Sequence, residues 1–292
     1  MDVYQVASWG AMLVTIEVLL ILLIPLGNGV IIAAVLTHRQ LRKPGDILVA
    51  NLATADIVIG TFVLPFDLYV VVAQKYFQVA IPCCVIPFSW ILALTFSVQC
   101  LFFIALEKYF AILYPLKHLA LATNKKALLA GIGGWLFAVI VSVCSMLVRN
   151  EWTSEILCPF QPNFMTVFNS SFITFLIITS VFMYIRVFAT LVKPTVLPHG
   201  SAVFRSRRCH IKKTKMMAVV LFMFVLFWSP LIVYFLYMNI TRQQAFTPIA
   251  RLFVLLGTCN SLINCIVYLC KREEFRKMVL NVFKRRKPRT EA

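Results

Sequence analysis

Charged side chains are scarce in this sequence. Asp, Glu, Lys and Arg make up 13% of its 292 residues, whereas hydrophobic residues make up 61%. An ordinary soluble domain has about 25% charged residues, so that class is excluded. The 28 basic residues outnumber the 11 acidic ones, but no soluble basic domain is left to bind nucleic acid. The nine cysteines lack metal-ligand spacing and no nucleophile–base set is present, so neither a metal site nor an enzyme is predicted.

Long apolar blocks fill most of the chain instead. A membrane-spanning α-helix needs roughly 20 apolar residues, and blocks of this length are too long for barrel strands. The sequence therefore predicts an all-α membrane protein with a seven-transmembrane helix bundle. The first block lacks the basic start of a cleavable signal peptide, so we expect it to be retained as an anchor. The seven blocks are residues 11–37, 46–73, 83–114, 127–148, 165–192, 213–239 and 246–270.

The basic residues indicate an orientation. The connecting segments alternate in Lys and Arg content, and one set holds 24 of these residues against 4 in the other. Basic segments stay in the cytoplasm, so the amino terminus is predicted outside and the carboxyl terminus inside. This gives an extracellular segment 1–10, a seven-helix membrane domain 11–270, and a cytoplasmic segment 271–292 with an amphipathic helix and a basic tail.

Several short motifs follow one another in these blocks. They are Gly27-Asn28, the stretch from Asn51 to Asp56, Glu107-Lys108-Tyr109, Trp135, Phe227-Trp228-Ser229-Pro230, and Asn264-Cys265-Ile266-Val267-Tyr268. Each motif alone is weak, but their order and spacing resemble the rhodopsin-like G-protein-coupled receptors over essentially the whole chain. The resemblance implies a plasma-membrane receptor whose partners are a small extracellular ligand, a heterotrimeric G protein and the lipid bilayer.

The resemblance gives the pair Glu107 and Lys108 a role as a switch. The acid would restrain its basic neighbour at rest, and the base would contact the G protein in the active state. The family usually has Arg at position 108, and Lys lacks its planar fork, so we expect a looser switch. The alternative is an ordinary interfacial ion pair worth about 0–1 kcal/mol. The resemblance assigns the rest of the switch to Tyr109, Tyr184, Trp228, Pro230, Asn264 and Tyr268.

Polar residues inside the apolar blocks mark a second site. Asp56 lies in the middle of a block, which by default indicates function. The resemblance gathers it with other polar residues around an allosteric sodium ion, and a carboxylate, hydroxyls and amides suit such a hard cation. The alternative is a hydrogen-bonded network without an ion. The other members are Asn28, Ser97, Asn260 and Ser261, with Trp228 beside them.

Two acids lie further toward the outside. Glu17 and Asp67 each stand eleven residues, about three helical turns or roughly 16 Å, from Asn28 and Asp56. They either face an outward cavity and meet a cationic ligand, or extend to the membrane boundary.

The resemblance also places a ligand pocket, and its lining is mostly apolar. Trp90 stands where amine receptors carry an Asp, and Thr258 stands where opsins carry the retinal lysine, so no retinal is expected. The lining favours an apolar, lipid-like ligand or a cation near Asp67, and the short ends argue against a large protein ligand. The full set is Asp67, Trp90, Ile91, Leu94, Phe168, Phe172, Leu231, Ile232, Phe235, Val254 and Thr258.

Covalent modifications are expected at four positions. The resemblance implies a disulfide between Cys83 and Cys158, and Cys270 at the inner membrane edge is a weak candidate for palmitoylation. Asn239 begins an N-glycosylation sequon on the outer side. The sequon at Asn169 lies within the fifth block, where we expect no modification.

Two other interpretations remain open at this point. The departures from the family pattern at Lys108, Cys265 and Leu176 are compatible with a receptor fold that couples weakly or not at all. A seven-helix transporter would need paired ionisable residues near the middle of the bilayer, and only Asp56 is clearly there.

Overall fold

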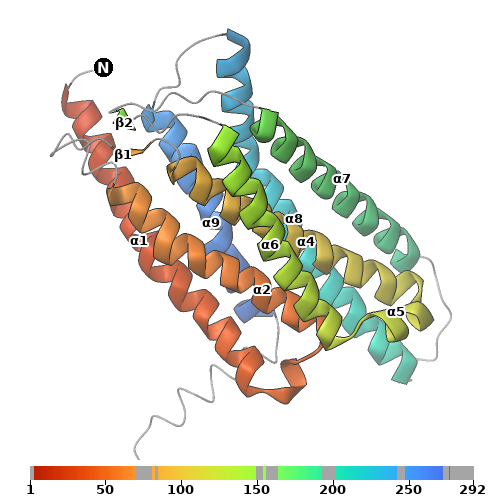
Figure 1. Ribbon diagram of the computed structural model, residues 1–292. Coiled ribbons are helices and arrows are strands. Elements are labelled where there is room, and N and C mark those ends of the chain that lie inside the picture. Colours follow the sequence, from red (N-terminus) through yellow and green to blue (C-terminus); the bar gives the residue numbers. More distant parts are fainter. Residues whose placement is uncertain are drawn as a thin grey trace, which may run out of the picture.

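The computed structural model describes residues 3–69, 81–82, 85–148, 154–155, 164–192, 202–241, 247–271 and 276. Helices account for nearly all of them (Figure 1). The long helices are α1 (Val3–Thr37), α2 (Pro44–Val58), α4 (Val85–Leu113), α6 (Asn124–Val148), α7 (Phe164–Val192), α8 (Ala202–Thr241) and α9 (Thr247–Lys271). The shorter elements are η1 (Arg39–Leu41), the π-helical η2 (Ile59–Val63), α5 (Pro115–Leu121), and the strands β1 (Ile81–Pro82) and β2 (Ser154–Glu155).

Seven segments are long and apolar enough to cross a membrane, which confirms the seven-helix bundle. The bounds agree with the apolar blocks to within a few residues at most ends. The segments are Gly10–Thr37, Pro44–Tyr69, Phe88–Leu113, Asn124–Leu147, Val167–Val192, Thr214–Tyr234 and Ile249–Lys271.

The helices bury one face and expose another that is just as apolar. Leu26, Phe62, Ile178 and Phe222 are exposed although each lies within a spanning segment. In water such a surface would be unstable, whereas lipid tails solvate it. The outer faces of the bundle are therefore its lipid contacts.

The helix α4 lies at the centre of the bundle and packs against α2, α6, α7 and α8, while α1 packs against α2 and α9. Figure 1 shows the start of the chain and the two short strands at one end of the bundle and α5 at the other. The strands pair antiparallel, with Ile81 opposite Glu155 and Pro82 opposite Ser154.

Two helices depart from a plain α-helical course or from the family pattern. The second span changes from α2 to the π-helical turn Ile59–Val63 and then continues as helix over residues 64–69. The seventh span, α9, is one uninterrupted helix through Cys265, whose thiol donates to the Leu262 carbonyl at 3.0 Å. Cysteine keeps the backbone N–H that a proline would remove, so the helix needs no break at this position. Beyond Lys271 only Arg276 is described, so the predicted amphipathic helix lies outside the described residues.

Candidate functional site

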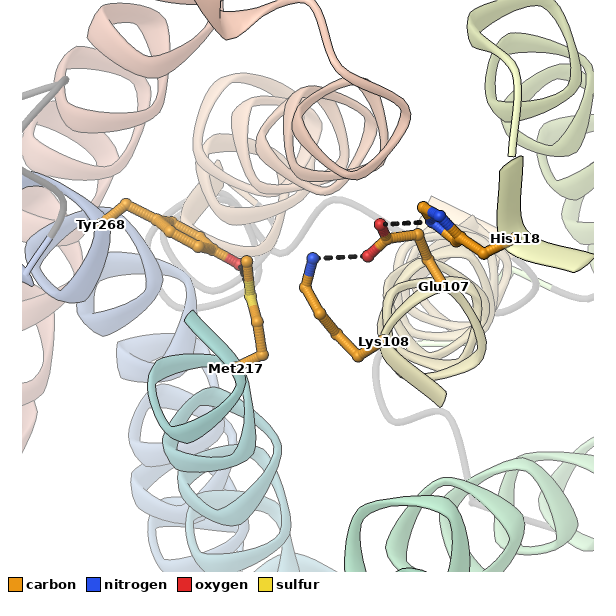
Figure 2. A network of polar contacts seen from close by, with 5 residues as sticks. All are labelled: Glu107, Lys108, His118, Met217 and Tyr268. Atoms are coloured by element: carbon orange, nitrogen blue, oxygen red, sulfur yellow. Dashed lines mark hydrogen bonds and ion pairs between the residues drawn. The ribbon is translucent and has the colours of Figure 1, made fainter. Parts of the chain in front are cut away.

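A three-residue polar network closes the α5 end of the bundle (Figure 2). Lys108 Nζ lies 2.5 Å from Glu107 Oε2, and His118 Nε2 lies 3.2 Å from Glu107 Oε1. Glu107 and Lys108 come from the last turns of α4, while His118 comes from the short helix α5. Each carboxylate oxygen thus has its own nitrogen partner, and the network ties α4 to the segment that follows it.

The Glu107–Lys108 pair is mostly buried rather than exposed at the interface. Only 13% of the Glu107 side chain and 11% of the Lys108 side chain are exposed. The value of about 0–1 kcal/mol expected for an exposed pair therefore does not apply, because removing one partner of a buried pair leaves an uncompensated charge. Gly45 at the start of α2 covers the pair closely: a Cβ there would lie 3.1 Å from Glu107 Oε2 and 3.2 Å from Lys108 Nζ. Any larger residue at position 45 would press on the pair.

The opposite side of Lys108 faces the sixth and seventh spans. Figure 2 shows Met217 of α8 meeting Tyr268 of α9 there, and the Tyr268 hydroxyl donates to the Met217 sulfur at 3.5 Å. Met217 and Tyr268 are buried, as is Tyr184 on α7. Lys108 is therefore held on its acidic side and bordered by a thioether and a phenol on the other. His118, Met217 and Gly45 were not anticipated as site residues, because only packing brings them to the pair.

A second polar group lies in the middle of the bundle. Asn264 Nδ2 donates to Asp56 Oδ2 at 3.2 Å, and the Ser261 hydroxyl is a further hydrogen-bond donor to the Asp56 carboxylate. Asn28 Nδ2 donates to the Ile24 carbonyl at 3.1 Å and to the Ser261 carbonyl at 3.2 Å. The residues expected from sequence thus connect the first, second and seventh spans.

This polar core is rich in acceptor oxygens with unused capacity. Four buried oxygens of this core have no hydrogen-bond partner within the described part of the chain. Oxygen atoms beside a buried carboxylate are suitable ligands for a hard monovalent cation, whereas amide nitrogens and thiols are not. The four atoms are Asn28 Oδ1, Ser97 Oγ, Asn260 Oδ1 and Asn264 Oδ1.

Trp228 lies in a close aromatic setting. Its indole meets Trp90 of α4 edge to face, with ring centroids 6.2 Å apart, and the ring centroid of Phe224 lies 6.1 Å away. Gly257 of α9 makes room for it, because a Cβ there would lie 3.0 Å from the indole ring. Pro230 follows two residues later within α8. The third, sixth and seventh spans therefore meet around this tryptophan.

The residues expected to line the ligand pocket divide into two groups. Leu231 and Thr258 are buried, and Trp90, Ile91, Leu94, Phe172 and Val254 are partly buried. Phe168 and Ile232 are 46% and 58% exposed, so they lie on an outer surface of the helices rather than in the packed interior. The side chain of Phe235 lies outside the described residues.

The two outer acids have a basic partner that sequence reasoning missed. Glu17 is completely buried, and its Oε2 pairs with Nη2 of Arg251 on α9. Asp67 interacts electrostatically with both of them and accepts a hydrogen bond from the Trp90 indole. The need of Arg251 for some partner could be inferred from its place within the apolar seventh block, but not that the partner is Glu17.

Only some of the positions predicted to be modified lie within the described residues. Cys83, Cys158 and the side chain of Asn239 lie outside the described residues. Cys270 is exposed. Asn169 is buried and accepts a hydrogen bond from the Thr95 hydroxyl at 3.0 Å, so its sequon lies within the bundle. Among the described residues no group of three or more His, Cys, Asp and Glu could hold a metal ion.

Comparison with known proteins agrees with this architecture. The family model described as 7 transmembrane receptor (rhodopsin family) matches residues 27–268. The chain is 27% identical to the Alpha-1A adrenergic receptor of Oryzias latipes over 86% of its own length and 62% of that receptor's. It is 27% identical to the Histamine H2 receptor of Cavia porcellus, covering 92% of the chain and 79% of that receptor. It is 26% identical to the human Neuropeptide Y receptor type 2, covering 91% and 74%.

These matches, together with the seven spans, place the chain in the rhodopsin family of seven-transmembrane receptors. It is a multi-pass membrane receptor and not an enzyme.

Proposed function

We propose that this receptor binds a small extracellular ligand and activates a heterotrimeric G protein. The partly buried network of Glu107, Lys108 and His118 carries this proposal. In this network Lys108, the base of the family motif, is paired with Glu107, its acid. Met217 of α8 and Tyr268 of α9 lie beside the pair. Opening the network would release a cation at the basic end of the bundle, where a G protein would bind.

The proposed orientation rests on charge and on the fold together. The connections at the end that carries α5 belong to the set rich in Lys and Arg. The start of α1 and the strands β1 and β2 lie at the other end, where basic residues are few. The positive-inside rule then puts α5 in the cytoplasm and the amino terminus outside.

The proposed ligand is small and either apolar or cationic. The buried residues around Trp90 and Trp228 offer an apolar surface, and Asp67 adds a carboxylate at its edge. Relatives named for histamine and for neuropeptide Y differ in the size of the ligand their names indicate, so likeness alone does not choose between ligands.

We also propose that Asp56 and the oxygens around it hold a sodium ion in the resting receptor. Asn28, Ser97 and Asn260 contribute buried acceptor oxygens that no described protein group satisfies. When bound, the ion would supply positive charge beside a carboxylate that is otherwise buried without a cation. Water molecules that satisfy the same oxygens would be the ion-free alternative.

A second candidate is a receptor that couples weakly. Lys108 offers a point charge in place of the planar fork that a G protein would meet in relatives with Arg. Leu176 in α7 and Cys265 in α9 stand where the family usually has helix-bending prolines, and α9 passes Cys265 without interruption.

Activation biosensors for each G-protein class, expressed in cells with the receptor, would test the proposal. Wild type is compared with Lys108→Gln, and exposed Lys125→Gln serves as the matched control. We expect basal or ligand-driven activation of at least one class in wild type and in the control, and a loss of it in Lys108→Gln. If no G-protein class is activated by any ligand of a library, the result would favour the weak-coupling alternative instead.

A further inference from the structure

A charged triad lies in the outer part of the bundle, and each member comes from a different span. Glu17 belongs to α1, Asp67 to the helical segment 64–69, and Arg251 to α9. Glu17 has no exposed surface, and only 12% of the Arg251 side chain is exposed. The two helices that carry this ion pair pack directly against each other (Figure 1).

The triad has an excess of one negative charge. Arg251 is already paired with Glu17, and Asp67 is the second carboxylate within its electrostatic reach. The Trp90 indole donates a hydrogen bond to Asp67 but adds no charge. One cation therefore remains to be supplied from outside the described protein.

Two buried atoms of the triad have unused hydrogen-bonding capacity. Glu17 Oε1 and Arg251 Nε have no hydrogen-bond partner within the described residues. Buried polar side-chain atoms in proteins nearly always have a partner, supplied by the protein, by water or by a ligand. A carboxylate oxygen can only accept, so Glu17 Oε1 requires a donor.

The triad lies toward the end of the bundle that the proposed orientation puts outside. Asp67 comes eleven residues after Asp56, about three helical turns or roughly 16 Å along the second span. Asp67, Trp90 and Arg251 are all partly exposed, so a small ligand can reach them.

We propose that Asp67 anchors the ammonium or another organic cation of the ligand, with the Glu17–Arg251 pair and Trp90 holding it in place. This deepens the proposed function, on which it rests, by choosing the cationic ligand over the neutral one. Trp90 orients this anchor through its indole N–H.

The same geometry disfavours other ligand charges. An anion would need Arg251 to leave Glu17, which would strand a completely buried carboxylate. A bare metal ion finds only two acids and no third ligand of the usual kinds among the described residues.

Trp90 also connects the anchor to the centre of the receptor. It donates to Asp67 through its ring nitrogen and meets Trp228 of α8 edge to face at 6.2 Å. A cation that draws Asp67 toward itself changes the hydrogen bond that orients Trp90. Trp90 is thus a positioning residue, and the indole of Trp228 is the next group that responds to it.

The test uses the full chain purified in lipid nanodiscs without any G protein. The probes are three matched pairs: benzylamine, 2-phenylethylamine and 2-cyclohexylethylamine, each with the alcohol that replaces its ammonium by a hydroxyl. Ligand-observed NMR titration gives the affinity of each probe. For at least one pair we expect the amine to bind wild type 10-fold or more tightly than the alcohol, and Asp67→Asn to reduce this preference below twofold.

Two further variants separate the anchor from the pair beside it. Glu17→Gln leaves Arg251 free to pair with Asp67, so the preference for the amine should fall although Asp67 is intact. The double variant Glu17→Gln with Arg251→Gln removes both charges of the pair and leaves Asp67 as the single charge, so the preference should return. Thermal unfolding of each sample identifies variants that fail to fold. If one of the single variants fails to fold, the double variant still tests the proposal.

The inference is overturned if no amine is preferred in wild type, or if the preference survives Asp67→Asn. Failure of the inference and failure of the proposed function can be told apart. Amine binding without activation of any G protein in cells would overturn the proposed function alone. Activation by neutral ligands only, with no preference for amines, would overturn the inference and leave the proposed function standing.

Discussion

Replacing Glu107 by Gln should raise basal activity strongly. The carboxylate has two nitrogen partners, Lys108 at 2.5 Å and His118 at 3.2 Å, one on each oxygen. A glutamine amide keeps only one acceptor oxygen, so one hydrogen bond to a charged group is lost, at a cost of about 1.5–3 kcal/mol. If the network exists only in the resting state, about 2 kcal/mol shifts the equilibrium toward the active state roughly 30-fold. An active fraction of about 1% would then become about 20%.

The assay is ligand-independent G-protein activation in cells at matched surface expression. His118→Phe removes one bond but keeps the charged pair, so an intermediate rise is expected. Lys125→Gln, on the exposed face of α6 near the same end of the bundle, should leave basal activity unchanged.

A rise of less than twofold for Glu107→Gln would refute this reasoning. It would mean that the network is equally strong in both states, or that water replaces the lost bond at little cost. The small effect expected for an exposed ion pair would then have been correct, despite the burial of both side chains.

Three further substitutions test Lys108, the polar core and the packing around Trp228. Lys108→Arg should increase maximal ligand-driven signalling, because a planar fork makes paired contacts that an ammonium cannot; dose–response curves with an unchanged or lower maximum would contradict it. Asp56→Asn should abolish any sodium dependence of agonist potency, measured in sodium and in N-methylglucamine buffers, and a retained dependence would remove the ion from the polar core. Gly257→Val should lower the thermal stability of the purified receptor. A Cβ at this position would lie only 3.0 Å from Trp228, and overpacking costs about 1–3 kcal/mol. Gly133→Val is the matched control, because a Cβ at Gly133 meets nothing within 4 Å, and equal melting of the two variants would count against the steric argument.

The seven-helix fold could be predicted from the sequence because bilayer thickness constrains it directly. The length of each apolar block reports a span, and tertiary packing does not override that signal. Asp56 was also foreseeable, because a carboxylate inside an apolar block requires a reason to be there.

Partners brought together by packing were beyond the reach of the sequence. Arg251 and Glu17 are more than two hundred residues apart, and their pairing depends on how α1 packs against α9. The burial of Glu107 depends on α5 folding back with His118 and on the small residue Gly45 in α2.

The π-helical turn Ile59–Val63 gives the second span two halves that face independently. Each α-helical residue turns the chain by about 100°, and a π turn contains roughly one residue more than an α turn. If the same residues formed a plain α-helix with no change in length, everything after the turn would be rotated by about that angle. Asp56 and the polar core before the turn would keep their directions, whereas Asp67 would turn away from Arg251 and Trp90. The one extra residue that the π turn accommodates therefore sets the direction of Asp67 separately from that of Asp56.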